Sequence, residues 1–368
     1  MCYNILSIAV FEQKTDLSQK QKSYWEYGKG LPFMSYQIWN RRYTGSKYKL
    51  AQWISELIGE HCTGTSFCDL FAGTAVISKQ MLDNMKEVYI NDFLFSNEVI
   101  YRAFFEQQDF SQEKLDRIQT EYEQLCAQEL CENYVSQSFG GKFFSQNDAK
   151  KIGYIREQVE KRDDICEKEK NILLASLLYS ADKAANTVGH YDAFIKGKEI
   201  RDSFLFKLIE PYQYKDKTIH ISRRDANELA KEIRCDIVYI DPPYNSRQYS
   251  RFYHVLENIT TWKKPKLFGV ACKPEAENMS EYCKTRAAQV FENLLLSLDC
   301  RYIVVSYNNT YHSKSGSSRN KITLDEIRAA LEKRGSVSVY EKPYRFFNAG
   351  KTELYDHKEL VFITKVDE

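Results

Sequence analysis

Three apolar runs in this sequence each end in an acidic residue, and this repeated pattern constrains the fold more than any other feature. The runs SFCD, EVYIND and CDIVYID end at Asp69, Asp92 and Asp241. Short apolar runs of this kind indicate buried strands. After the first run, AGTA supplies the small residues of a tight turn, and VISKQMLDNM resumes a helical period. Strand, turn, helix and strand in this order predict a βαβ unit of the doubly wound α/β class, in which ligands bind beyond the carboxyl ends of the strands.

The rest of the chain divides into parts of different character. Residues 1–40 have no clear period and are predicted to form an extension. Residues 96–214 are charged and mostly helical in pattern, which predicts an inserted helical region. Strand patterns return at KTIHISRRD, CDIVYIDPPY and RYIVVSYNN, and SVSVYEKPYRFF with KELVFITKV predicts a closing antiparallel pair. We therefore expect a main α/β domain formed by residues 41–95 and 215–368.

Composition narrows the classes of function. The 368 residues include 52 basic and 51 acidic side chains, so the net charge of +1 neither favours nor excludes nucleic acid as a partner. No pair of the ten cysteines has CxxC spacing, and His190 and His254 lack partners at ligand spacing, so no metal is expected. No apolar stretch reaches the roughly 18 residues of a membrane span, and a signal peptide is not evident, which predicts a cytoplasmic protein without membrane contact.

The segment DPPY carries the most chemical information, because it follows directly on an apolar strand. An exocyclic amine such as that of adenine is a poor nucleophile, and catalysis needs acceptors for both of its N–H groups. The Asp241 carboxylate and the Pro242 carbonyl suit this task, since Pro242 and Pro243 fix the backbone in place. Tyr244 offers a flat face to a base that has left the duplex. These four residues are the predicted catalytic residues.

Several segments carry a resemblance to a known family. DPPYNSRQY with YHVLENI, RRYTGSKYKL and FCDLFAGTAVIS resemble motifs of the Dam/FokI-type (alpha-group) adenine-specific DNA methyltransferases. Two segments of the insertion, GGKFFSQNDAKKIGYIREQVE and SADKAANTVGHYDAFIK, resemble the target-recognition region of that family. The resemblance covers most of the chain. It implies a Rossmann-like class I methyltransferase fold, with a mostly parallel seven-stranded sheet and an inserted helical DNA target-recognition domain at 96–214.

The same resemblance implies the cofactor S-adenosylmethionine and a set of contacts to it. It implies that Tyr43, Gly45 and Lys47 lie against the methionine part of the cofactor, with Asp69 near its amino group, and that the loop from Phe71 to Gly73 wraps the cofactor. It also implies that Asp92 binds the ribose hydroxyls, that Asp225 binds the cofactor's adenine amine and that Asp241 lies at the reaction centre. In chain order the implied cofactor residues are Tyr43, Gly45, Lys47, Asp69, Phe71, Ala72, Gly73, Asp92, Asp225 and Asp241. The alternative for Asp92 and Asp225 is a role as helix N-caps.

One position departs from the family's loop pattern. Ala75 stands where the family commonly has a second glycine. Because alanine is tolerated at a helical residue with negative φ, we expect Ala75 to adopt that conformation, with altered packing but retained cofactor binding.

The residues after DPPY are the predicted contacts to double-stranded DNA: Asn245, Arg247, Gln248 and Tyr249. Further basic residues flank the predicted catalytic edge, and the alternative for each is a solvated face. They are Arg41, Arg42, Lys47, Lys49, Arg251, Lys263, Lys264 and Lys266.

The predicted reaction is the transfer of a methyl group from S-adenosylmethionine to N6 of adenine in duplex DNA. The family resemblance suggests the modification arm of a restriction-modification system, with a cognate restriction endonuclease as a possible partner. The alternatives that the sequence leaves open are methylation of a cytosine amine, of adenine in RNA or of a protein amide, and a DNA-binding regulator without catalysis.

Overall fold

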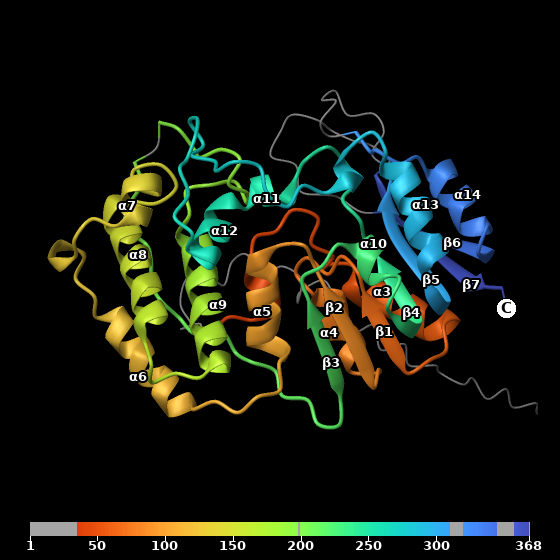
Figure 1. The fold of residues 1–368 in the computed structure, drawn as a ribbon, viewed down its shortest axis with the longest axis horizontal. Helices are drawn as coiled ribbons and strands as arrows, with labels where there is room; N and C mark the ends of the chain where they lie inside the picture. The colour runs from red at the N-terminus through yellow and green to blue at the C-terminus, as the bar shows by residue number, and fades with distance from the viewer. Residues whose placement is uncertain (1–34, 198, 310–318, 344–356, 368) are drawn as a thin grey trace, which may run out of the picture. The chain divides into compact units, whose positions relative to one another are not determined.

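The computed structural model describes residues 35–197, 199–309, 319–343 and 357–367. Most of the predicted extension, residues 1–34, lies outside the described residues, as do parts of the segments around residues 314 and 350. The described chain forms a seven-stranded sheet with helices on both faces, and a group of helices follows the second strand (Figure 1).

The strands have the order β3-β2-β1-β4-β5-β7-β6. They comprise β1 (Ser66–Asp69), β2 (Glu87–Asn91), β3 (Thr218–Ser222), β4 (Arg234–Ile240), β5 (Asp299–Asn308), β6 (Gly335–Pro343) and β7 (Lys358–Val366). β7 runs antiparallel to both β5 and β6, whereas β1 to β5 pair in parallel. The predictions of a mostly parallel seven-stranded sheet and of a closing antiparallel pair are confirmed.

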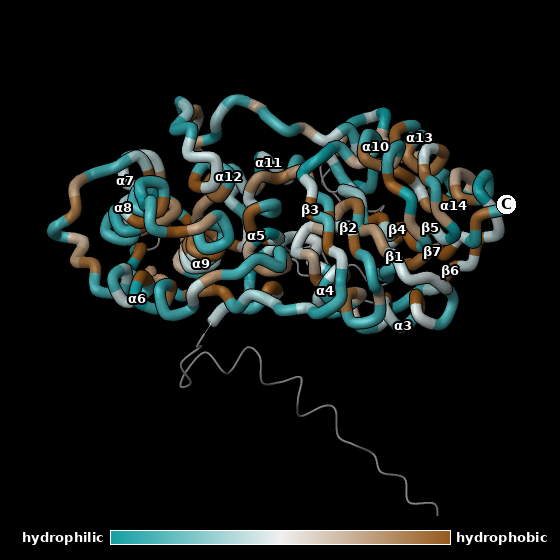
Figure 2. The backbone as a smooth tube through the Cα atoms, turned by 60° about the horizontal axis from the view of Figure 1, so that its bottom comes forward, coloured by the Kyte–Doolittle hydropathy of each residue, from teal (hydrophilic) through white to brown (hydrophobic). Residues whose placement is uncertain are grey.

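Each face of the sheet has its own apolar core, because successive side chains of a strand point to opposite faces. On one face, Phe67 and Ile237 pack with α3 (Ala51–His61), α4 (Val76–Leu82) and α5 (Phe95–Phe105). On the other face, Cys68 and Val238 pack with α10 (Ala226–Leu229), α13 (Ala287–Ser297) and α14 (Leu324–Glu332). Strands covered on both faces have near-continuous hydrophobic sequences, and Figure 2 shows such hydrophobic stretches along β4 and β5.

In the described part of the predicted insertion, four longer helices and a short one follow α5. These are α6 (Gln112–Glu123), η2 (Ala127–Glu129), α7 (Tyr134–Phe139), α8 (Gln146–Lys161) and α9 (Glu167–Ala184). Their apolar side chains join the core on the α5 face of the sheet. The predicted boundary at residue 95/96 falls at the start of α5, which contacts both β3 and α9 and so belongs to both parts (Figure 1).

The segment after β4 links the sheet to these helices. It forms α11 (Tyr249–Phe252) and α12 (His254–Thr261), and η1 (Ile38–Asn40) and η3 (Glu281–Cys283) are short 3-10 turns elsewhere in the chain. The half-buried Glu257 of α12 accepts, with its carboxylate, the backbone N–H groups of Phe95 and Ser96, at 3.0 and 2.8 Å. An acid at this place complements the partial positive charge of the α5 N-terminus and anchors α12 next to it.

Candidate active site

All ten predicted cofactor residues line one cavity at the carboxyl ends of β1, β2 and β4. The cavity has about 940 Å³ of space, part of it open to solvent. Pro243, Gln248 and Tyr249 line the same cavity, whereas Pro242 and Tyr244 are not among its lining residues.

The loop between β1 and α4 is held in place by hydrogen bonds from three directions. The Gly73 N–H donates to Asp92 Oδ2 at 3.0 Å, and the Tyr101 hydroxyl donates to the Gly73 carbonyl at 2.7 Å. The Ala72 N–H donates to the Asn91 carbonyl at 2.9 Å. Asp92 also accepts the Leu94 N–H at 2.9 Å, so its carboxylate organises the loop and the start of α5 together.

The expectation for Ala75 is wrong. Ala75 has φ 54° and ψ 25°, in the left-handed region, and it directly precedes the first residue of α4. The reason is the tightness of the turn: Gly73 also has φ 54°, and the Ala75 N–H donates to the Ala72 carbonyl. The second glycine of the family pattern therefore corresponds to a position with positive φ, and in this chain an alanine adopts that conformation.

Asp69 is the last residue of β1 and is almost fully buried beside the cavity. Its Oδ2 accepts the Ser78 hydroxyl at 2.7 Å, but its Oδ1 has no hydrogen-bond partner. Burial raises the pKa of Asp69 to about 7, and the nearby charges of Asp241 and Asp92 add to this rise. A buried carboxylate oxygen without a partner is costly, which makes Oδ1 an attractive acceptor for a cationic or donor group in the cavity.

Asp225 has the N-cap geometry that the alternative interpretation describes. Its Oδ1 accepts the N–H groups of Asn227 and Glu228, at 2.9 and 3.3 Å, at the start of α10. It also lines the cavity, beside Tyr282, a residue that the sequence did not indicate. The Tyr282 ring meets Phe71 edge-on at 5.0 Å between centroids, and its hydroxyl donates to Asn227 at 2.8 Å.

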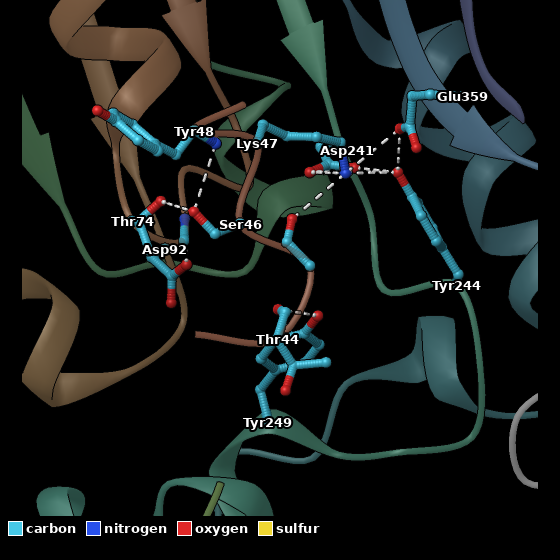
Figure 3. A network of polar contacts seen from close by, with 12 residues as sticks. Thr44, Ser46, Lys47, Tyr48, Thr74, Asp92, Asp241, Tyr244, Tyr249 and Glu359 are labelled. Carbon is cyan, nitrogen blue, oxygen red and sulfur yellow. Dashed lines mark hydrogen bonds and ion pairs between the residues drawn. The ribbon is translucent and has the colours of Figure 1, made fainter. Parts of the chain in front are cut away.

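Asp241 belongs to a network of four polar side chains, in which Lys47 and Tyr244 each contact the other three members (Figure 3). The buried Lys47 Nζ lies 2.9 Å from Asp241 Oδ2, 2.8 Å from the Tyr244 hydroxyl and 3.4 Å from Glu359 Oε1. The Tyr244 hydroxyl in turn contacts Asp241 Oδ1 and lies 3.0 Å from Glu359 Oε1. Although burial lowers the pKa of Lys47, the charges of Asp241 and Glu359 outweigh it, and the pKa is raised above its usual value.

Glu359 is a second site residue, after Tyr282, that sequence analysis missed. It lies at the start of β7, is only 3% exposed, and is paired with Asn308 of β5. Burial raises the pKa of Glu359 to about 7, against the opposing effect of Lys47. The signal was present in KELVFITKV, because the first residues of an antiparallel strand lie at the edge where its parallel neighbours end.

The four predicted DNA contacts fall in different surroundings. Asn245 is half-buried, and its Oδ1 accepts the Arg247 N–H at 3.1 Å; the Arg247 guanidinium lies 5.7 Å from the centre of the Phe252 ring. Gln248 is buried and bonded to Ser280. Tyr249 faces the cavity, and its hydroxyl donates to the Thr44 carbonyl at 3.0 Å.

Two of the flanking basic residues are internal and do not form a DNA-facing surface. Arg41 is 5% exposed, with a hydrogen bond to Asn97, and Lys47 belongs to the Asp241 network. Lys49, Lys263, Lys264 and Lys266 are exposed. The internal pair shows that basic residues near a catalytic edge also serve to compensate buried carboxylates and aromatic faces.

The comparison with known proteins identifies the family. A family profile described as D12 class N6 adenine-specific DNA methyltransferase matches residues 43–322. This range includes every predicted site residue and ends before Glu359. The chain belongs to this family. It is thus an adenine-specific DNA methyltransferase. Its mixed α/β sheet is the fold expected of a Rossmann-like methyltransferase. The family match supports adenine in DNA as the substrate over a cytosine amine, RNA or a protein amide.

Similar proteins align with this methyltransferase over most of its length. The type II methyltransferase M.NlaIII of Neisseria lactamica is 34% identical over 330 residues, which cover 86% of this chain and 95% of that protein. The type II methyltransferase M.CviAII of Paramecium bursaria Chlorella virus 1 is 31% identical, with 89% and 98% covered. The type II methyltransferase M.FokI of Planomicrobium okeanokoites is 29% identical; 89% of this chain matches 53% of that protein.

The described residues of the methyltransferase contain neither a candidate metal-binding cluster nor a candidate membrane-spanning helix. No group of three or more His, Cys, Asp or Glu residues in these ranges is placed to hold a metal ion. Among the helices of the same ranges, none has the length and apolar character needed to cross a bilayer.

Proposed function

We propose that the cavity binds S-adenosylmethionine and that Asp241 aligns the amine of a flipped-out adenine beside it. The observation that carries this proposal is made at Asp69, which lines the cavity and whose buried Oδ1 has no hydrogen-bond partner. An ammonium group such as that of the cofactor's methionine part would satisfy this oxygen and favour the ionised carboxylate.

The remaining residues of the cavity fit the other parts of the cofactor. Asp92 and Asp225 each place a carboxylate at the cavity, where hydroxyls and an amine need acceptors, and Phe71 with Tyr282 offers an aromatic corner. The proposed set is completed by Tyr43, Gly45, Lys47, Ala72, Gly73 and Asp241. When bound, S-adenosylmethionine supplies a methyl group that its sulfonium centre already activates, so the protein's task is alignment.

At the target amine, the protein supplies acceptors. Asp241 would accept one N6–H and the Pro242 carbonyl the other, which directs the nitrogen lone pair as its geometry becomes tetrahedral. The Tyr244 ring is the proposed stacking surface for the base, and its hydroxyl is held by Asp241, Glu359 and Lys47. Pro243 would keep this segment rigid.

We further propose that the helices within residues 96–214 form the target-recognition region, and that Asn245 and Arg247 contact the DNA. A large element is needed to read base edges in the major groove of a duplex. The names of similar proteins, which are type II methyltransferases, support a role in restriction and modification with a cognate endonuclease. DNA treated with this enzyme should then resist cleavage by that endonuclease and remain sensitive to unrelated ones.

Cofactor binding is tested by calorimetric titration of the protein with S-adenosylmethionine. We expect saturable binding that Asp69→Asn weakens about tenfold or more, because the amide cannot form the ion pair. Asp83→Asn, a matched change at the exposed end of α4, should leave the affinity unchanged. Equal affinities for the wild type and Asp69→Asn would contradict the proposed placement.

A further inference from the structure

The Tyr244 hydroxyl faces two carboxylate oxygens but has only one proton to donate. The hydroxyl accepts from Lys47 and carries a single hydrogen, yet it faces both Asp241 Oδ1 and, at 3.0 Å, Glu359 Oε1. If the hydroxyl donates to Asp241, only a protonated Glu359 completes the second contact. If it donates to Glu359, the proton must be on Asp241. The contacts therefore fit the state in which one proton is shared along a path from Asp241 through Tyr244 to Glu359, the state that is reached once Glu359 has accepted a proton.

The surroundings of Glu359 suit a group that gains and loses this proton. Lys47 lies 3.4 Å from Glu359 Oε1, and Asp241 and Tyr239 face it from β4 and the segment after it. Its cross-strand neighbours are the neutral Asn308 on β5 and Lys342 on β6, whose ammonium lies over the Trp53 ring. Burial raises the pKa of Glu359 to about 7, so both protonation states are accessible near neutral pH.

Methylation of an amine creates the need for such a group. When the nitrogen of the target amine gains a methyl group, it carries one proton more than the neutral product, and that proton must leave. Asp241 is the acceptor at the amine in the function proposed above, but Lys47 already neutralises its charge. A second carboxylate in reach of Asp241 allows the proton to move on and restores Asp241 as an acceptor.

We propose that Glu359 is a positioning residue of the reaction, which holds Lys47 and Tyr244 against Asp241 and receives, through the Tyr244 hydroxyl, the proton that the target amine loses. In this step the amine proton passes to Asp241, the Asp241 proton passes to the Tyr244 oxygen, and the Tyr244 proton passes to Glu359. Charge and protons balance, because the amine becomes neutral and Glu359 changes from carboxylate to carboxylic acid. The inference rests on the proposed function.

The test is the rate of methyl transfer in a single turnover, measured at saturating S-adenosylmethionine and DNA from pH 6 to 8.5. The wild-type rate should rise as the pH increases through about 7, because Glu359 must be ionised to accept the proton. Glu359→Gln should be about tenfold slower or more and should lose this rise. Glu341→Gln, on the neighbouring strand β6 and paired with Lys358 at the surface, should behave like the wild type.

A second variant covers the case in which Glu359→Gln does not fold, as judged by its melting temperature. Tyr244→Phe keeps the ring but removes the hydroxyl link, and we expect it to lose the same rise with pH. If both variants fold, the Glu359→Gln, Tyr244→Phe double variant should be no slower than the slower single variant, because both changes break one path.

A wild-type rate profile in Glu359→Gln, or in Tyr244→Phe where Glu359→Gln does not fold, would overturn the inference, as would multiplicative effects in the double variant. Those results would leave the proposed function intact. A wild-type protein that formed no N6-methyladenine would instead remove the proposed function itself.

Discussion

Gln248 and Ser280 exchange two hydrogen bonds between the segment after β4 and the segment before η3. The Gln248 Nε2 donates to the Ser280 carbonyl at 2.9 Å, and the Ser280 N–H donates to Gln248 Oε1 at 2.7 Å. Both residues line the cavity, and Tyr282 follows two residues later. An amide that the sequence predicts to contact DNA thus fixes one wall of the proposed cofactor cavity.

This pairing predicts that Gln248→Ala weakens cofactor binding and leaves DNA binding largely unchanged. The variant loses two hydrogen bonds and leaves a backbone N–H and a carbonyl unsatisfied, so we expect about a tenfold increase in the Kd for S-adenosylmethionine. Calorimetry for the cofactor and fluorescence anisotropy for DNA measure the two affinities separately.

Arg247, the residue next to Gln248, should show the opposite pattern of effects on DNA and cofactor binding. Arg247→Ala should weaken DNA binding and reduce its salt dependence, because a cation that contacts a phosphate releases counterions, while cofactor affinity stays unchanged. If Gln248→Ala impaired DNA binding and spared the cofactor, the role assigned here to Gln248 would be wrong.

Buried carboxyls at the site predict that stability falls as the pH rises toward neutrality. Asp69 has a pKa of about 7 in the folded protein, well above the ordinary value that the unfolded chain restores. The folded state therefore binds a proton that the unfolded state releases above about pH 4. The stabilisation is complete below that pH and is lost as the pH rises through 7.

Urea unfolding of the wild type and Asp69→Asn at pH 5, 6, 7 and 8 measures this effect. The difference in the free energy of unfolding should change by up to about 1.4 kcal/mol per pH unit below pH 7 and level off above it. Glu359 acts in the same direction, and taking the difference between the two proteins cancels its contribution. A difference that is constant over this pH range would contradict the raised pKa of Asp69.

The left-handed conformation of Ala75 predicts a strict limit on side-chain shape at this position. Ala75→Val should destabilise the protein by about 2 kcal/mol or more, because a β-branched residue is strained at positive φ and Ala75 is fully buried. Ala75→Gly, which has no such strain, should stay within about 1 kcal/mol of the wild type. Thermal or urea unfolding distinguishes these results, and equal stability of Ala75→Val and Ala75→Gly would argue against the conformation.

Much of the site follows from the order of residues along the chain. Asp69, Asp92 and Asp241 each stand at the carboxyl end of a predicted strand, and parallel strands bring such ends to one edge of a sheet. The same rule places the loop from Phe71 to Gly73 at that edge. These positions depend on local pattern and sheet direction, both of which a sequence carries.

Other features depend on contacts that the local sequence does not encode. The inward turn of Gln248 requires Ser280, and the burial of Arg41 requires Asn97. Glu359 contacts Lys47 and Tyr244 only because β7 inserts next to β5 in the reverse direction, so that its first residues meet the ends of the parallel strands. The conformation of Ala75 likewise follows from how the loop is tied to Asn91 and Asp92, not from the preferences of alanine.

The most direct test of the account is to incubate the purified protein with unmethylated duplex DNA and labelled S-adenosylmethionine, and to identify the modified nucleosides by mass spectrometry. We predict N6-methyladenine as the product, with a loss of about 1,000-fold or more in Asp241→Ala, which should still bind the cofactor measurably. Methylation of a different base, or an Asp241→Ala variant that forms N6-methyladenine at the wild-type rate, would contradict the central claim.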